Sequence, residues 1–426
     1  MSSAELTLHN ITSRRTLYLV FATLTLLVLG LIYAWSIFAG PIGSAFTDYQ
    51  PYLPQVFQIS MFSFCLSALV GAQIVKRQSA KLSIIIAAVL MAVGFICTAR
   101  FTGEGIWALF LFYGVFTGSG CGIAYNAIIS LVNPWFPDRI GLASGIMMMG
   151  FGISSLVFGS LATVLFGLVE WTTVFLIIAA TAFVVLLLLA LIVRPAPGDI
   201  GARLGVTATA AGVGESPTQQ RFLMKTKVFW VFWIWGILIV AAGLTLIGTS
   251  KQGAEALALD ESVFVGFSAI LVGLVSTMNG LSRIFNGALF DKIGLVPVMM
   301  LSSVVCFFCA LGLSVSLALG IGPLYIASAI LIALPYGSAP VLSAAFARQR
   351  YGAKNFASNL SIITCCIAIA AALNIVLVTV LGSPAGDNGP LIYGILAGLV
   401  VLSFVGTLVF RGLYKNDLAT IKEELA

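Results

Sequence analysis

The sequence has very little charge. Only 8% of its 426 residues are Asp, Glu, Lys or Arg, against about 25% in an average soluble domain. Hydrophobic residues make up 60% of the chain, and the mean hydropathy is +1.11. Such a chain could not cover its own surface with polar groups in water, so the composition excludes a soluble protein. A transmembrane helix needs about 20 mostly apolar residues, and we expect most of the chain to lie in a lipid bilayer.

The apolar segments also lack the side chains that bind metals or perform acid–base chemistry. The only histidine, His9, is close to the N-terminus. Seven cysteines lie in apolar runs, where they are expected to pack as small apolar residues: Cys65, Cys97, Cys121, Cys306, Cys309, Cys365 and Cys366. Cys306 and Cys309 form a CxxC motif without a second pair of ligands. The sequence therefore predicts no cofactor, metal site or disulfide, and it argues against a membrane enzyme.

Apolar segments of helical length predict twelve transmembrane helices, six on each side of a polar stretch. The segments cover approximately 17–44, 54–75, 82–101, 106–133, 142–166, 172–193, 229–250, 263–289, 296–318, 323–346, 355–381 and 391–411. The stretch between the two sets is rich in Pro and Gly and is expected to be a linker. We therefore expect an all-α membrane protein with one six-helix bundle over 1–193, a cytoplasmic linker over 194–227 and a second six-helix bundle over 228–426.

The basic residues predict the orientation of these helices, because Lys and Arg accumulate in cytoplasmic loops. With the N-terminus in the cytoplasm, nearly all of them fall on the cytoplasmic side; Arg100 and Lys251 fall outside, and Arg283 falls within a helix. Both termini are therefore expected in the cytoplasm, with the chain in the cell membrane, most simply a bacterial inner membrane. The net charge of +6 reflects this bias, and we expect no nucleic acid as a partner.

Arg283 is the one basic residue that this topology places deep in the membrane, and all 15 acidic residues fall in loops or tails. It precedes Asp291 by eight residues, or about 12 Å along a helix, in an apolar core about 30 Å thick. A charge at this depth costs at least about 2.5 kcal/mol. We expect a mobile anion to offset that cost, because a guanidinium matches a carboxylate with two parallel hydrogen bonds. The alternative is that Arg283 only ties helices together through backbone carbonyl groups.

Further polar side chains are predicted at a comparable depth and are candidates for the same site. Asn279 precedes Arg283 by one helical turn and shares its face. The others are Tyr33, Tyr125, Asn126 and Tyr336. Each tyrosine could instead be a packed or interfacial residue.

Several motifs resemble the oxalate:formate antiporter family of the major facilitator superfamily. The most specific lie between the fourth and fifth predicted helices. The motifs are Gly30-Leu-Ile-Tyr-Ala-Trp-Ser36, Gly118-Ser-Gly-Cys-Gly-Ile-Ala-Tyr125, Trp135-Phe-Pro-Asp-Arg139, Gly141-Leu-Ala-Ser-Gly145, Gly150-Phe-Gly152, Phe229-Trp-Val, and Arg283 with Gly287 and Asp291-Lys-Ile-Gly294. The resemblance covers nearly the whole chain.

The resemblance implies two six-helix bundles that rock around a central site and carry small carboxylates. It matches Arg283 to the family's substrate-binding arginine and Tyr33 and Tyr125 to cavity tyrosines. It also places a conserved loop motif at Asp291 and Lys292, which we expect, with Arg139, to take part in gating.

The chain departs from the oxalate exchanger at one informative position. Where that carrier has a second cation, a lysine in the eleventh helix, this chain has Ile363. Since one arginine neutralises one negative charge, we expect secondary transport of a small monocarboxylate such as lactate, pyruvate, acetate or formate, by a monomer. Proton symport, anion exchange and uniport stay open. The alternatives are oxalate:formate exchange and, in another class, a transporter-like sensor or receptor.

Overall fold

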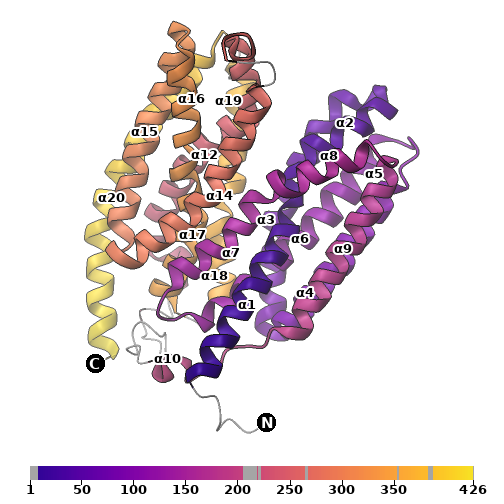
Figure 1. The fold of residues 1–426 in the computed structure, drawn as a ribbon. Coiled ribbons are helices and arrows are strands. Elements are labelled where there is room, and N and C mark those ends of the chain that lie inside the picture. Colours follow the sequence, from indigo (N-terminus) through magenta and orange to yellow (C-terminus); the bar gives the residue numbers. More distant parts are fainter. Residues whose placement is uncertain are drawn as a thin grey trace. The chain divides into compact units, whose positions relative to one another are not determined.

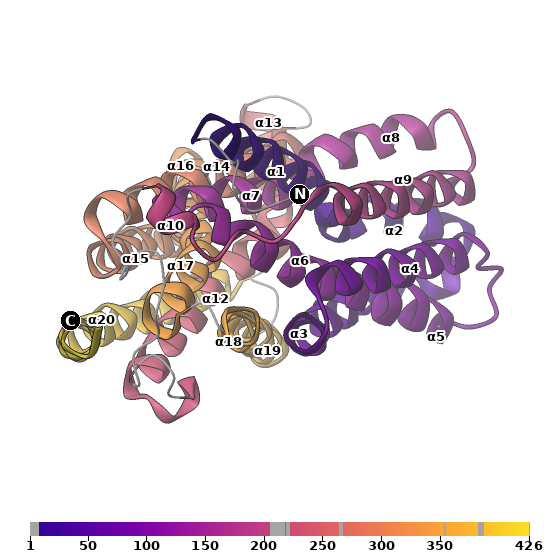
Figure 2. The same cartoon turned by 90° about the horizontal axis from the view of Figure 1, so that it is seen from below.

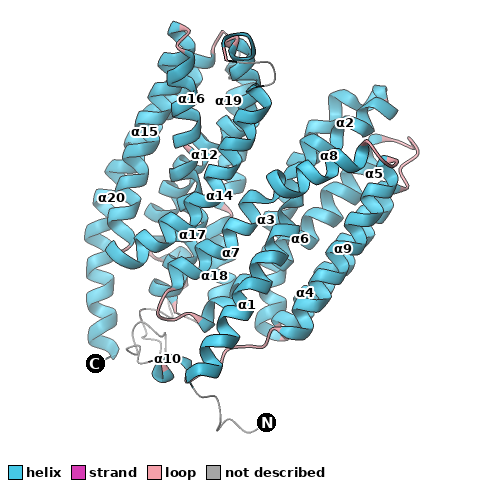
Figure 3. Ribbon diagram, viewed as in Figure 1, coloured by secondary structure: helices cyan, strands magenta, loops and turns pink. Residues whose placement is uncertain are grey.

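The computed structural model describes residues 8–204, 218, 222–263, 267–352, 355–381 and 387–425, and the statements below refer to these residues. All regular elements in these ranges are helices (Figures 1 and 3). The predicted all-α class is therefore confirmed. Parts of the predicted linker, residues 205–217 and 219–221, lie outside the described residues, as does Lys354.

The chain forms two compact units. Unit 1 comprises Met1–Val213 with Ala353–Ile362, and unit 2 comprises Gly214–Gly352 with Ile363–Ala426. The short segment Ala353–Ile362 thus groups with unit 1, although it lies between helices of unit 2 in the sequence. The bundle and linker boundaries predicted above stay predictions.

Unit 1 is built from α-helices interrupted by short 3-10 and π segments. In chain order its elements are α1 (Leu8–Leu29), η1 (Gly30–Ala34), α2 (Trp35–Ala45), η2 (Thr47–Tyr52), α3 (Leu53–Arg77), α4 (Ala80–Ala99), α5 (Ile106–Leu109), η3 (Phe110–Thr117), α6 (Gly118–Val132), η4 (Asn133–Trp135), α7 (Ile140–Ser154), η5 (Ser155–Gly159), α8 (Ser160–Phe166), α9 (Trp171–Ile192), α10 (Ile200–Arg203) and most of α18 (Phe356–Thr364). The long helices α4 and α9 lie side by side (Figures 1 and 2).

Unit 2 contains the longest helices. Its elements are η6 (Leu223–Lys225), α12 (Lys227–Ala256), α13 (Leu259–Ser262), α14 (Phe267–Ile293), α15 (Leu295–Leu319), α16 (Gly322–Leu331), α17 (Ala333–Tyr351), α19 (Cys366–Leu381) and α20 (Gly389–Leu425). Helices α15 and α20 pack along each other (Figures 1 and 2).

Among the described residues, eleven helical stretches are long and apolar enough to cross a membrane. They correspond to eleven of the twelve predicted spans. The remaining predicted span corresponds to α14, which contains Asn279, Arg283 and Asn286. The helices are thus consistent with a twelve-helix membrane protein.

Glycine allows α6 to pack closely against α3. A Cβ atom added at Gly118 would collide with the backbone of Ser60, and one at Gly122 would collide with the carbonyl oxygen of Phe64. Backbones in contact at small residues are typical of helix packing in membranes. These contacts hold the helix that carries Tyr125 and Asn126.

The last helix is longer than the sequence predicts. The apolar pattern ends near residue 411, yet α20 continues to Leu425. The continuation buries Tyr414 and Ile421, which are 5% and 2% exposed. Their spacing of seven residues places them on one helical face, so packing against unit 2 stabilises this polar end.

Candidate functional site

Arg283 is buried in the second half of α14. Its relative exposure is 4%, and those of Asn279 and Asn286 are 7% and 4%. The spacings of four and three residues place all three side chains on one face of α14. Arg283 also takes part in interactions inside the protein. The arginine and the two amide side chains thus share one buried face of α14.

Helix α17 packs directly on this face of α14. The side-chain nitrogen of Asn286 donates to the carbonyl oxygens of Ser282 (2.8 Å) and Leu334 (2.9 Å). A Cβ atom at Gly337 would collide with the hydroxyl of Ser282, and it would lie 2.9 Å from the carbonyl oxygen of Asn279. The close contact at Gly337 and the hydrogen bond from Asn286 to Leu334 hold α14 and α17 together near Arg283.

Asn286 was not among the predicted site residues. A signal was present, since Asn286 continues the spacing of Asn279 and Arg283 along one helical face. The amide of Asn279, by contrast, was a candidate from the start. Its side-chain oxygen is buried and accepts no hydrogen bond from the described residues.

Tyr336 reaches unit 2's interior from α17 and is 6% exposed. It packs closely against α12 at Gly243, where an added Cβ would lie only 2.6 Å from its Cβ and Cδ2 atoms. Four residues later Pro340 lies inside α17. Proline has no N–H group, so the carbonyl oxygen of Tyr336 receives no helical hydrogen bond from that position. Tyr336 thus lies on α17, the helix that packs against α14 and its Arg283.

In unit 1 one aromatic ring connects the two candidate tyrosines. Phe151 of α7 makes edge contacts with Tyr33 (ring centroids 5.2 Å apart) and with Tyr125 (5.1 Å). The ring of Phe64 lies 5.4 Å from that of Tyr125 and 6.0 Å from that of Phe151. Tyr125 is 5% exposed, and Tyr33 is partly exposed. The two tyrosines thus belong to a single aromatic cluster with Phe64 and Phe151.

Asn126 makes a structural contact in unit 1. Its side-chain nitrogen donates to the carbonyl oxygen of Ala357 (3.0 Å) and to the hydroxyl of Ser361 (2.5 Å) in α18. Ser361 in turn donates to the carbonyl oxygen of Ala68 in α3 (2.9 Å). The amide therefore ties α18 to α6, and the hydroxyl ties it to α3.

The predicted gating residues lie at helix ends. Asp291 and Lys292 are exposed at the end of α14, which stops before Gly294 with a φ of +82°. Arg139 lies 4.0 Å from Asp138, while a shorter ion pair of 2.9 Å joins Asp138 to Arg15 of α1. Arg15 was not predicted as a partner of this loop.

Two other observations bear on the chemistry of the site. Ile363, at the position of the exchanger's second cation, is fully buried. Within the described ranges, no three His, Cys, Asp or Glu side chains lie close enough together to hold a metal ion. Arg283 is thus the charged group around which the candidate site is built.

Comparison with known proteins identifies the family. Residues 16–375 match the family described as Major Facilitator Superfamily. The chain is 25% identical to an uncharacterized MFS-type transporter, YhjX, of Escherichia coli over 84% of this chain and 86% of the relative. It is 26% identical to the oxalate:formate antiporter of Oxalobacter formigenes over 67% of this chain and 65% of the relative. The resemblance found in the sequence motifs is therefore confirmed.

The fold is also that of a known transporter. The crystal structure of the proton:xylose symporter XylE superposes with a TM-score of 0.71 at 16% identity, covering 94% of this chain and 96% of the symporter. At that identity the likeness concerns the fold alone. With the family match over most of its length, the chain belongs to the Major Facilitator Superfamily and is a multi-pass membrane transporter.

Proposed function

We propose that the protein is a secondary active transporter of a small monocarboxylate and that Arg283 binds the carboxylate group. The observation that carries this proposal is a permanently charged guanidinium, 4% exposed, in the interior of a membrane helix. Burying such a charge is expensive, and in transporters it marks a substrate or ion pathway. A bound anion would lower the cost of keeping it there.

The chemistry of the group favours a carboxylate. A guanidinium donates two parallel hydrogen bonds to the two oxygens of a carboxylate, each contributing about 1.5–3 kcal/mol. Arg283 already interacts with the protein, so the substrate would share or replace some of these interactions. Asn279, one turn away, offers an amide that could hydrogen-bond the rest of the substrate.

The remaining site residues belong to the same proposal. In unit 2, Tyr336 is proposed to contact substrate. In unit 1, Tyr33, Tyr125 and Asn126 are proposed as further binding residues, and Asp291, Lys292 and Arg139 as gating residues. The proposed organisation is a monomer in the cell membrane with cytoplasmic termini, bundles over 1–193 and 228–426, and a linker over 194–227.

A single cation favours a substrate with one negative charge. Oxalate carries two, and the second would be buried without a counterion unless another group replaced the exchanger's lysine. Ile363 is apolar and fully buried, which supports lactate, pyruvate, acetate or formate. Oxalate:formate exchange is the alternative, because a relative at 26% identity is named for that activity.

The way in which transport is coupled to protons depends on which groups can carry a proton. The acidic residues all lie outside the predicted spans, so a proton would have to travel on the substrate, on water or on residues nearer a membrane face. The proposal therefore covers two mechanisms, proton symport with the carboxylic acid and exchange of one carboxylate for another.

The test is uptake of labelled lactate, formate and oxalate into proteoliposomes containing the purified protein. We expect lactate or formate to accumulate and oxalate to compete poorly. Stimulation by an inward proton gradient would identify symport, and stimulation by internal carboxylate would identify exchange. Preferential uptake of oxalate would support the alternative, and uptake of none of the three would contradict the proposal.

A further inference from the structure

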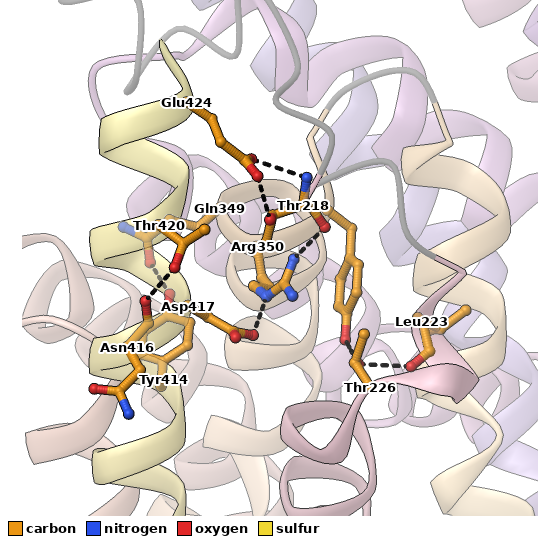
Figure 4. A network of polar contacts seen from close by, with 11 residues as sticks. Thr218, Leu223, Thr226, Gln349, Arg350, Tyr414, Asn416, Asp417, Thr420 and Glu424 are labelled. Atoms are coloured by element: carbon orange, nitrogen blue, oxygen red, sulfur yellow. Dashed lines mark hydrogen bonds and ion pairs between the residues drawn. The ribbon is translucent and has the colours of Figure 1, made fainter. Parts of the chain in front are cut away.

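The C-terminal part of α20 carries two carboxylates on one face. Asp417 and Glu424 are seven residues apart, or two helical turns. Both project from the same side of α20, Asp417 toward Arg350 and Glu424 toward Thr218 (Figure 4). Glu424 and the adjacent Glu423 are both exposed residues, and the carboxylate of Glu424 contacts Thr218. The two carboxylates thus face other residues of unit 2, in a region that the proposed substrate site does not include.

Arg350, at the end of α17, is the buried centre of this region. It is 1% exposed. Its Nε donates to a carboxylate oxygen of Asp417 (2.6 Å), and its Nη1 donates to the carbonyl oxygen of Thr218 (2.9 Å) (Figure 4). Its guanidinium also lies 5.0 Å from the ring of Tyr351. A buried arginine with a carboxylate partner is expensive to disrupt, because either charge left alone would be buried without compensation.

Thr218 is held at each of its polar atoms. Its N–H donates to one oxygen of Glu424 (2.9 Å), and its hydroxyl donates to the other (2.8 Å). Its carbonyl oxygen accepts from Arg350. The residue is 2% exposed. Hydrogen bonds to ionised groups are stronger than neutral ones, so this residue is recognised specifically.

A second contact holds the chain shortly before α12. The hydroxyls of Thr226 and Tyr351 lie 2.6 Å apart, and Thr226 also donates to the carbonyl oxygen of Leu223 (2.7 Å). Arg350 and Tyr351 are neighbours in sequence, so the end of α17 contacts this part of the chain at both Thr218 and Thr226 (Figure 4).

We propose that the end of α17 and the C-terminal part of α20 form a docking surface for the segment that leads into α12, anchoring it to unit 2 at Thr218. This surface is defined by Arg350, Tyr351, Asp417 and Glu424. The C-terminal part of α20 then contributes to attaching this segment through Glu424 and, by way of Arg350, through Asp417.

Limited trypsin digestion of the purified full-length protein tests this docking. Lys225 is exposed and lies between the two anchored residues, so cleavage after it reports undocking. We expect Glu424→Gln and Thr218→Val to speed this cleavage by about tenfold, because each removes a hydrogen bond to an ionised carboxylate. Glu423→Gln is the matched control and should be cleaved at the wild-type rate.

Asp417→Asn provides a second arm, since it leaves Arg350 buried beside a neutral amide. We expect it to speed cleavage after Lys225 at least as much as Glu424→Gln does, with an unchanged elution volume in detergent. If Asp417→Asn fails to fold, the two milder variants still decide the matter. Cleavage of both Glu424→Gln and Thr218→Val at the rate of Glu423→Gln would overturn the proposal.

Discussion

The side-chain amide of Asn286 in α14 donates a 2.9 Å hydrogen bond to the carbonyl oxygen of Leu334 in α17. This bond crosses between the helix that carries Arg283 and the helix that carries Tyr336. It lies one turn beyond Arg283, and Gly337 packs against Ser282 beside it. Asn286 therefore fixes the spacing of two helices from which candidate binding residues project.

Replacing Asn286 by alanine should loosen that spacing. The change removes two hydrogen bonds, one of them buried and one part-buried, which costs about 1–3 kcal/mol. We expect a lower thermal midpoint in detergent and a higher KM for carboxylate uptake in proteoliposomes. Asn416→Ala is the control, because Asn416 is exposed on α20. Equal thermal midpoints and equal KM values for the two variants would show that Asn286 does not set the spacing of α14 and α17.

The helices could be predicted from the sequence because membrane burial imposes a simple pattern. Long apolar segments predicted the spans, and α14 was recognised even though Arg283, Asn279 and Asn286 reduce its hydropathy. The burial of Arg283 could also be predicted, since its distance from Asp291 along a helix fixes its depth. These conclusions rest on local sequence alone.

The partners of polar side chains could not be predicted in the same way. The contact of Asn126 with substrate stays a prediction, and the sequence did not indicate that its amide contacts residues 357 and 361, more than two hundred positions later. Arg350 and Asp417 were assigned to a loop and a tail, yet they form a buried ion pair. Such pairs depend on how distant helices pack, and the apolar periodicity of a single helix carries no information about that.

Arg283 allows a test that separates charge from geometry. Arg283→Ala should reduce carboxylate uptake at least about a hundredfold, equivalent to about 2.7 kcal/mol. Arg283→Lys keeps the charge but loses the planar pair of donors, so we expect it to restore only part of the uptake. The control is Arg411→Ala, at an exposed position on α20. Full activity of Arg283→Ala, in protein that elutes as the wild type does, would contradict carboxylate binding by this residue.

Gly243 should be sensitive to a single added carbon. A Cβ atom there would lie 2.6 Å from Cβ and Cδ2 of Tyr336, so Gly243→Ala must displace the tyrosine or separate α12 from α17. Overpacking of this kind costs about 1–3 kcal/mol, and we expect a lower thermal midpoint and slower uptake.

Gly398→Ala is the matched control for that change. It adds the same atom on α20, where no other atom lies within 4 Å of the new carbon. Alanine favours a helix over glycine by up to about 1 kcal/mol, so this variant should be as stable as the wild type or more so. If Gly243→Ala behaved in the same way, close packing against Tyr336 would not matter.

Two substitutions test the contacts of the Asn126 amide, one that removes the side-chain amide and one that replaces its donor with an acceptor at nearly the same size. Asn126→Ala removes its bonds to Ala357 and Ser361, but the Ser361 hydroxyl, 2.9 Å from the Ala68 carbonyl oxygen and 2.8 Å from that of Ala357, still donates to one of them, so we expect a loss of about 1 kcal/mol. Asn126→Asp instead places a carboxylate against that carbonyl oxygen at a position only 2% exposed. Burying an unpaired charge costs more than losing a hydrogen bond. The thermal midpoint should therefore fall further for aspartate than for alanine, and the reverse order would mean that the amide nitrogen does not face α18.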